Sequence, residues 1–211
     1  MNNKNAFLKA SIKLALVAIA CSVATSSFAS PINTVGNAGF ESPNQGAGAF
    51  SYYGGQTIGD WTFTGNSGIA ADGSPMNVSA PSGNQAGFLQ QSSEISQAFD
   101  FSGGMFTVGF LAEFRNFYGG NTVDVMVDGN TLFAFSPATG SEFSAYQSDA
   151  VALSAGQHVL SFVGTSTPDY TTFIDDVKIN AVPEPTSVAL LAIGIAALFA
   201  GRRKRTGTYN V

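Results

Sequence analysis

Residues 105–115 read Met-Phe-Thr-Val-Gly-Phe-Leu-Ala-Glu-Phe-Arg, and this stretch decides the fold class. Every second residue in it is apolar, namely Phe106, Val108, Phe110, Ala112 and Phe114. Successive side chains of a β-strand point to opposite faces, so this alternation places all five on one face. We therefore predict a strand with one face in the core, and with Glu113 and Arg115 on the other face.

The rest of the body repeats this strand-and-turn pattern. Asp128-Gly129-Asn130 forms the predicted turn of a hairpin between strands at 122–128 and 131–135. No helical period runs between Ser30 and Asn180, and turn residues interrupt the chain every 8–12 residues or so. Further strands are predicted at 51–53, 61–64, 86–90, 95–101, 147–153, 157–164 and 172–180. About ten short strands without helices predict an all-β fold, a two-sheet antiparallel jelly-roll sandwich spanning residues 30–181.

The charge is distributed unevenly along the 211 residues. Between Ser30 and Pro183 the only cations are Arg115 and Lys178, against thirteen Asp and Glu. A body with net charge −11 repels phosphate backbones, so nucleic acid is excluded as a partner. It suits divalent cations and neutral, hydroxyl-rich ligands better. The single Cys and single His of the chain leave little room for zinc or cysteine chemistry.

The N-terminus predicts a secretory signal peptide, residues 1–29. Three lysines precede an uncharged apolar run at 14–24, and Ser27-Phe28-Ala29 places small residues before a cleavage between Ala29 and Ser30. The run is short for a membrane span. Two alternatives remain open, an N-terminal anchor and a lipoprotein acylated at Cys21.

The C-terminus has three parts in a fixed order. Val182 is followed by a Pro-Glu-Pro triplet, an uncharged run at about 186–201 and a basic cluster; the residues concerned are Pro183, Glu184, Pro185, Arg202, Arg203, Lys204 and Arg205. As a helix, the run would reach about 24 Å, slightly less than a hydrocarbon core. We expect a single transmembrane helix with its basic end in the cytoplasm. A plain single-pass anchor is the alternative, and 206–211 form a short tail.

This C-terminal segment, residues 182–205, resembles the PEP-CTERM sorting signal of Gram-negative bacteria, also labelled the ice-binding protein C-terminal domain. The resemblance implies processing by an exosortase, a membrane enzyme, and association with exopolysaccharide and biofilm. It predicts export across the inner membrane, transient anchoring, and delivery to the cell surface or extracellular matrix.

The body has a resemblance of its own. Asn37-Ala38-Gly39-Phe40-Glu41 opens it, Gly59-Asp60-Trp61-Thr62 follows, and Phe173-Ile174-Asp175-Asp176-Val177 closes it. This order looks like the galactose-binding-like jelly roll of carbohydrate-binding modules. The resemblance implies a structural Ca²⁺ held by Glu41 with Asp175 or Asp176. Ca²⁺ prefers oxygen ligands, and an inward Asp175 needs a partner. The alternative is that Asp175 accepts backbone hydrogen bonds without any metal.

Exposed aromatic residues on loops are the candidate glycan contacts, with Arg115 as a hydrogen-bonding partner. The candidates are Tyr52, Tyr53, Arg115, Phe117 and Tyr118, with Tyr146 and Tyr170 in similar loop-like sequence. Trp61 is predicted in the core and His158 as a structural histidine. The alternative for Arg115 is a surface ion pair with Glu113.

These patterns predict an exported, non-catalytic surface protein associated with a neutral glycan or exopolysaccharide. A purely structural surface protein without a glycan ligand is the alternative. A glycoside hydrolase is a third alternative, and it would require a pair of carboxylates across a cleft.

Overall fold

A computed structural model describes residues 35–137, 142–182, 191 and 193–197. Residues Ser30–Val182 form one compact unit. Its strands are β1 (Phe50–Tyr52), β2 (Gln56–Ile58), β3 (Trp61–Ala71), β4 (Gln85–Phe114), β5 (Val123–Val127), β6 (Asn130–Phe135), β7 (Ser144–Gln147), β8 (Val151–Gly164) and β9 (Thr171–Val182). Every pairing between them is antiparallel.

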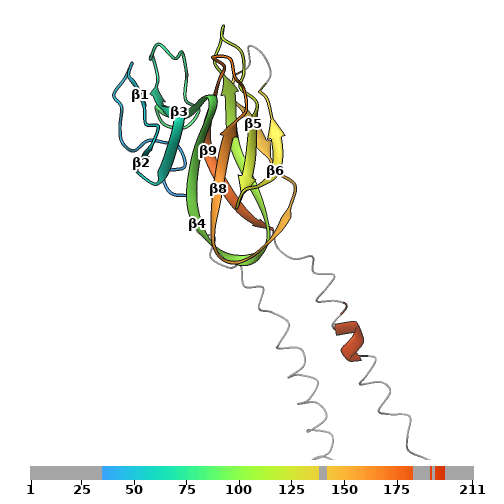
Figure 1. Cartoon of the computed structure of the whole chain (residues 1–211). Coiled ribbons are helices and arrows are strands. Elements are labelled where there is room, and N and C mark those ends of the chain that lie inside the picture. Colours follow the sequence, from blue (N-terminus) through green and yellow to red (C-terminus); the bar gives the residue numbers. More distant parts are fainter. Residues whose placement is uncertain (1–34, 138–141, 183–190, 192, 198–211) are drawn as a thin grey trace, which may run out of the picture. The chain divides into compact units, whose positions relative to one another are not determined.

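The strands form two layers that share β3 and β4 (Figure 1). The first layer has the order β2-β3-β4-β8-β5-β6. In the second layer the order is β1-β3-β4-β9-β4-β7, with the two ends of β4 on either side of β9. The all-β sandwich predicted from the alternation of residues 105–115 is therefore confirmed.

The shared strands pass between the layers at bends that glycine and left-handed residues allow. The register between β3 and β4 shifts at Gly65, which has φ +62°, opposite Gln91 at φ +57°. A Cβ on Gly65 would lie only 3.2 Å from the Ser92 carbonyl oxygen, so glycine is required there. Ser67 fastens this bend, because its hydroxyl lies 2.9 Å from the carbonyl oxygens of both Thr64 and Glu94. A second bend takes β4 through Gly103 and Gly104, and β8 bends beside it at Ala155 and Gly156.

The space between the layers is filled largely by aromatic rings. Trp61 is fully buried, stacks on Phe40 at 5.0 Å between ring centroids, and donates from Nε1 to the Asn37 carbonyl oxygen at 2.9 Å. The placement of Trp61 in the core is confirmed. The predicted apolar face of residues 105–115 is also confirmed, since all five alternating residues are buried.

A long connection covers the outer face of the second layer. Residues 72–84, which we call the strap, join β3 to β4 and bring Met76 and Val78 onto Phe88 and Phe173. These four side chains are buried in a second, smaller apolar cluster. The outer face of this layer is therefore not freely exposed to solvent.

Several sequence expectations about individual strands were wrong. The separate strands predicted at 86–90, 95–101 and 105–115 are one continuous strand, β4, because the chain bends without losing its hydrogen bonds. The strands β2 and β7 were missed. Tyr146 is not a loop residue but lies in β7, packed on Phe110 and Phe135.

The predicted signal peptide with its Ala29–Ser30 cleavage site, the Pro-Glu-Pro triplet and the basic cluster lie outside the described residues. Residues 191 and 193–197 of the expected transmembrane segment are helical. Among the residues that are described, no helix has the length and apolar character needed to cross a membrane.

Candidate functional site

Asp175 lies on β9 and is completely buried. Its Oδ2 accepts a hydrogen bond from the Ser82 amide of the strap at 3.1 Å, and its Oδ1 accepts from the Asp176 amide at 2.7 Å. Gly39 passes so close that a Cβ there would lie 3.3 Å from Asp175 Oδ1. The predicted burial of Asp175 is confirmed, but its side chain lies under the strap on the side of Phe173, because a register shift at Asp176 turns Val177 and Ile179 into the main core. The first partners of this carboxyl are backbone amides.

Glu41, which lies before β1, contacts the same end of the strap. Its Oε1 accepts from the Asn84 and Gln85 amides, both at 2.9 Å. Gly83, at φ +76°, has no room for a Cβ because Glu41 Oε1 occupies that position. Glu41 and Asp175 therefore hold neighbouring turns of one segment, residues 82–85.

The electrostatics of this pair favour a cation. Burial, together with the nearby Asp176 and Glu41 carboxylates, raises the pKa of Asp175 to about 7, even though its two amide donors lower it. A divalent cation would favour the ionised form of this carboxyl. Glu41, Asp175 and the Ser82 carbonyl oxygen beside Gly39 are hard oxygen donors of the kind that Ca²⁺ prefers.

Asp176 does not join them, because its Oδ2 lies 2.6 Å from Lys178 Nζ. In the described ranges, 35–137 and 142–182 included, no three His, Cys, Asp or Glu side chains are grouped as a metal site. The residues present therefore fit Ca²⁺ only with two carboxylates and added carbonyl or water oxygens.

A second group of candidate residues lies where β4 ends and β9 begins. The Arg115 guanidinium stands 4.1 Å above the Tyr118 ring centroid and donates from Nη2 to the Pro75 carbonyl oxygen of the strap at 3.0 Å. Phe117 has φ +72° and is 98% exposed, and Tyr118 is half exposed. The Tyr170 ring, also partly exposed, packs over Gly119. We call Arg115, Phe117, Tyr118 and Tyr170 the aromatic end.

The two remaining tyrosines come from other segments than the aromatic end. Tyr52 is half exposed on β1, with its ring edge against Phe88 and its hydroxyl 2.8 Å from Gln90 Oε1. Gln90 Nε2 in turn lies 3.4 Å from Thr171 Oγ1, so the Tyr52 hydroxyl reaches toward the start of β9 while its backbone stays on β1, four strand spacings from the C-terminal end of β4. Tyr53 packs against Phe63 and bonds to Gln45. The five candidates thus do not form one patch.

Glu113 and Arg115 are not an ion pair, although the sequence left that reading open. The described residues hold two ion pairs, and neither involves Glu113 or Arg115. Glu113 is buried, and burial together with Glu142 raises its pKa to about 7, against a hydrogen bond from the Ser79 amide. Arg115 Nε is buried without a hydrogen-bond partner in the described part of the chain. Both residues contact the strap, Glu113 from β4 and Arg115 from the residue after it.

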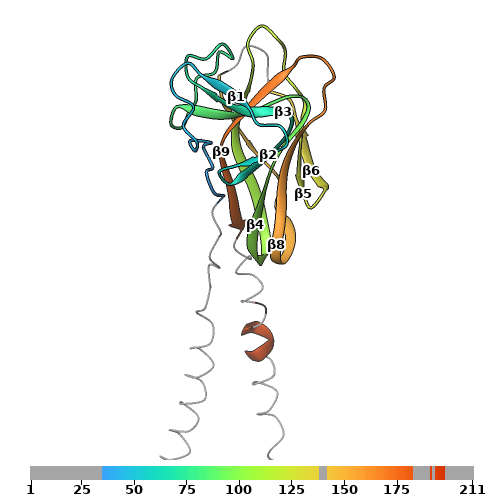
Figure 2. The ribbon, with the colours of Figure 1, turned by 60° about the vertical axis from the view of Figure 1, so that its left-hand side comes forward.

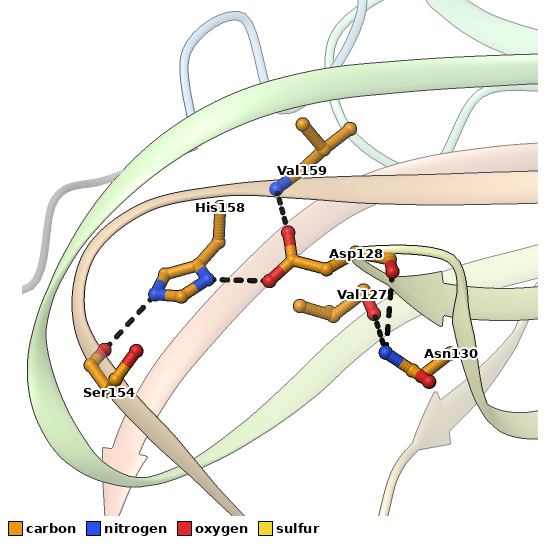
Figure 3. Close-up of polar contacts among 6 residues, drawn as sticks. All are labelled: Val127, Asp128, Asn130, Ser154, His158 and Val159. Atoms are coloured by element: carbon orange, nitrogen blue, oxygen red, sulfur yellow. Dashed lines mark hydrogen bonds and ion pairs between the residues drawn. The ribbon is translucent and has the colours of Figure 1, made fainter.

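His158 is structural, as predicted. Its Nδ1 lies 2.7 Å from Asp128 Oδ2, and its Nε2 lies 3.0 Å from the Ser154 carbonyl oxygen (Figure 3). An imidazole that faces a backbone carbonyl is not placed to take a proton from a serine hydroxyl.

The strand β9 ends at Val182, and the chain continues directly into Pro183-Glu184-Pro185, an uncharged run and a basic cluster. Residues 181–205 are a PEP-CTERM protein-sorting motif. The PEP-CTERM motif implies export and sorting to the cell surface by an exosortase. It covers only the C-terminal segment, so it describes the destination of the chain and not the activity of its body.

Comparison with solved structures supports the fold of the body. The carbohydrate-binding module TmCBM61, solved in complex with beta-1,4-galactotriose, superposes with a TM-score of 0.51 at 18% identity, over 72% of this chain and 100% of that one. A cyclase from Fischerella sp. TAU, solved with 4-(1H-Indol-3-yl)butan-2-one, gives 0.53 at 16% identity, over 74% and 100%. No curated protein matches the sequence. At these identities the likeness shows the sandwich fold alone.

Proposed function

We propose that this chain is an exosortase-sorted surface protein whose body binds a neutral glycan, without catalysis, at the aromatic end. The observation that carries the proposal is Phe117, held by a left-handed backbone with its ring almost wholly in solvent. Such a conformation costs free energy, and an exposed ring gains no burial in return. Aromatic faces pack on the C–H groups of sugars, so sugar binding would account for a strained backbone that exposes this ring.

The surroundings of the ring favour a neutral ligand over a charged one. Arg115 supplies guanidinium N–H donors for hydroxyl groups, and Tyr118 and Tyr170 offer further ring surface. Glu113 and Glu142 lie close by, and the body has a net charge of −11, so an anionic polymer is repelled. A hydroxyl-rich exopolysaccharide in a biofilm matrix fits these conditions.

The aromatic end is also far from the sorting motif along the body. Tyr170 precedes the first residue of β9, whereas Val182 is its last (Figure 2). Twelve residues of strand span about 36–40 Å. A ligand at the aromatic end would therefore not compete with an enzyme that acts at Pro183-Glu184-Pro185.

We further propose that Glu41 and Asp175, with the Ser82 carbonyl oxygen, hold a Ca²⁺ ion that stabilises the fold. Its role is to neutralise a buried carboxyl and to fix the end of the strap, residues 82–84, and the first residue of β4. It does not contact the glycan. Asp176 is left out of this ligand set because Lys178 neutralises it.

Affinity electrophoresis of the detergent-solubilised full chain tests glycan binding, with gels that contain β-1,4-galactan, xylan or another neutral polysaccharide. We expect retardation by at least one of them, and weakening in Phe117→Ala and Tyr118→Ala. Loss of one stacked ring costs about 1 kcal/mol, or roughly fivefold in affinity. Val159→Ala removes an exposed apolar side chain on β8 and is the matched control. Migration unchanged by every neutral polysaccharide would refute glycan binding and favour a purely structural surface protein.

A separate experiment tests the sorting assignment in cells. Replacing Pro183 and Pro185 by alanine should leave the unprocessed chain in the inner membrane, since a helix could then continue through the triplet. Immunoblots of fractionated cells would show a larger species there. Normal processing of this variant would contradict the role given to the Pro-Glu-Pro triplet.

A further inference from the structure

The single histidine of the chain lies beside the bend in β8. Ser154 precedes this bend and His158 follows it, with Ala155, Gly156 and Gln157 between them. The Nε2 contact with the Ser154 carbonyl oxygen therefore bridges the bend from one side to the other (Figure 3). The ring is covered, at 7% exposure of the residue, and packs at 5.9 Å from the Phe99 ring of β4.

The same imidazole also fixes the turn between β5 and β6. Asp128 opens this turn with φ +51°, and its Oδ2 faces His158 Nδ1 at 2.7 Å. Its Oδ1 accepts from the Val159 amide at 2.9 Å, while its own amide donates to the Val159 carbonyl oxygen at 2.9 Å. One side chain thus joins the β8 bend to the β5–β6 turn.

Both ring nitrogens of His158 face groups that can only accept a hydrogen bond. A carboxylate stands at Nδ1 and a carbonyl oxygen at Nε2. Neutral imidazole carries one N–H and so satisfies one of these contacts, whereas imidazolium carries two and satisfies both. With the neutral form, one lone pair would point at an oxygen lone pair 2.7–3.0 Å away.

We propose that His158 is a proton-dependent lock, held as imidazolium, which fastens the β8 bend to the β5–β6 turn and releases one of them when it loses its proton. Asp128 is the charged group that faces the ring from the turn. The strand β4 presents Phe99 to it, and the next β4 residue, Asp100, is exposed and pairs with Gln157. The hydrogen bond with Asp128 raises the pKa of His158 above its ordinary value of 6.5, more than burial lowers it. The lock therefore opens as the pH rises through a pKa that lies above 6.5.

Release is expected at the Ser154 contact. The carboxylate of Asp128 is the stronger acceptor, so a neutral ring keeps its single proton on Nδ1 and turns the Nε2 lone pair toward the Ser154 carbonyl oxygen. Gly104 pairs with Leu153 and Met105 with Val182, so the bend borders the end of β9 from which the sorting motif continues. Opening is thus local to residues 153–158 and the β4 residues paired with them.

Because the chain has one histidine, ¹⁵N NMR of the histidine-labelled, untagged full chain reports this ring alone. We expect both ring nitrogens to be protonated below a titration midpoint that lies above 6.5. In Asp128→Asn the midpoint should fall by a measurable step. In Asp100→Asn, which removes a neighbouring exposed charge, it should stay unchanged. Hydrogen exchange, corrected for its intrinsic pH dependence, should accelerate at residues 153–158 above the midpoint.

Two results would overturn the proposal. One is a wild-type ring whose titration midpoint lies at or below 6.5. The other is exchange at residues 153–158 that does not change across the midpoint. Both readings come from the wild-type chain, so the proposal stays testable if Asp128→Asn fails to fold.

Discussion

The buried carboxyl of Asp175 predicts an unusual pH dependence of stability, which calcium should cancel. Its pKa is raised from 3.8 to about 7, so the folded protein binds a proton more tightly than the unfolded chain. The contribution to stability is fully present below pH 3.8 and is lost as the pH rises to about 7. Without metal, the free energy of unfolding should therefore decrease between about pH 4.5 and pH 7.

The size of this decrease follows from the shift. At 1.36 kcal/mol for each pKa unit, a shift of about three units sets a ceiling of about 4 kcal/mol. Most of this change falls between pH 4.5 and pH 7, and we expect a decrease of about 3 kcal/mol over that interval. For a chain of this size, that corresponds to about 6–12 °C in Tm.

Thermal unfolding of the full chain at pH 4.5, 6 and 8, with EDTA or with calcium, is the assay. In EDTA, Tm should fall as the pH rises. With calcium the ion favours the ionised carboxyl, so the fall should flatten, and Tm at pH 8 should rise. At a hundredfold excess over its Kd, a ligand of the native state adds about 2.7 kcal/mol.

Glu113 provides the matched control, because its pKa is also raised to about 7 but it lies apart from Glu41. Asp175→Asn should reduce the pH slope and abolish the calcium response. Glu113→Gln should reduce the slope and preserve the calcium response. If wild-type Tm in EDTA is constant or rises from pH 4.5 to 7, the reasoning about buried carboxyls is wrong. If Asp175→Asn still responds to calcium, the proposed ligand set is wrong.

Three further changes probe the strap and the aromatic end by thermal unfolding. Gly83→Ala should lower stability by about 1–3 kcal/mol, since φ +76° strains alanine and its Cβ would displace Glu41 from the strap amides; an unchanged Tm would refute this anchoring. Met76→Ala opens a cavity over Phe88 and should cost about 2–5 kcal/mol, and a loss well below 1 kcal/mol would mean that the strap does not cover this face. Phe117→Ala should change stability by no more than about 0.5 kcal/mol, because its ring is 98% exposed, whereas a large loss would show a packing role for this side chain.

The sequence predicted those features of the fold that depend on local alternation. Phe106 to Phe114 lie in the core because a period of two leaves them no other face. Asp175 is buried on the same face of β9 as Phe173, but a register shift at Asp176 places Val177 in the other apolar cluster, and this break in the alternation was not predicted. The continuity of β4 could not be predicted in the same way. Gly103-Gly104 resembles a chain-reversing turn, but here it bends a strand that remains paired with β8 on both sides.

The sequence predicted the residue types of the candidate site better than it predicted which residues come together there. Exposed aromatic residues on loops identified Phe117 and Tyr118, but Tyr53 has the same local signal and packs against Phe63. Which aromatic residues stand beside the strap depends on contacts between residues about 40 positions apart, such as Arg115 and Pro75. No pattern along the chain encodes such a distance.

The strap connects the two proposed sites, and this gives calcium a use beyond stability. Asp175 and Glu41 bind its amides at residues 82–85, while Arg115 binds it at Pro75 and Glu113 binds it at Ser79. Residues 75 and 82 lie within one connection whose middle is pinned by Met76 and Val78. Ordering one end therefore limits the positions of the other, and the guanidinium above Tyr118 is held by that other end. A calcium-free protein should thus keep its aromatic rings and still bind glycan more weakly.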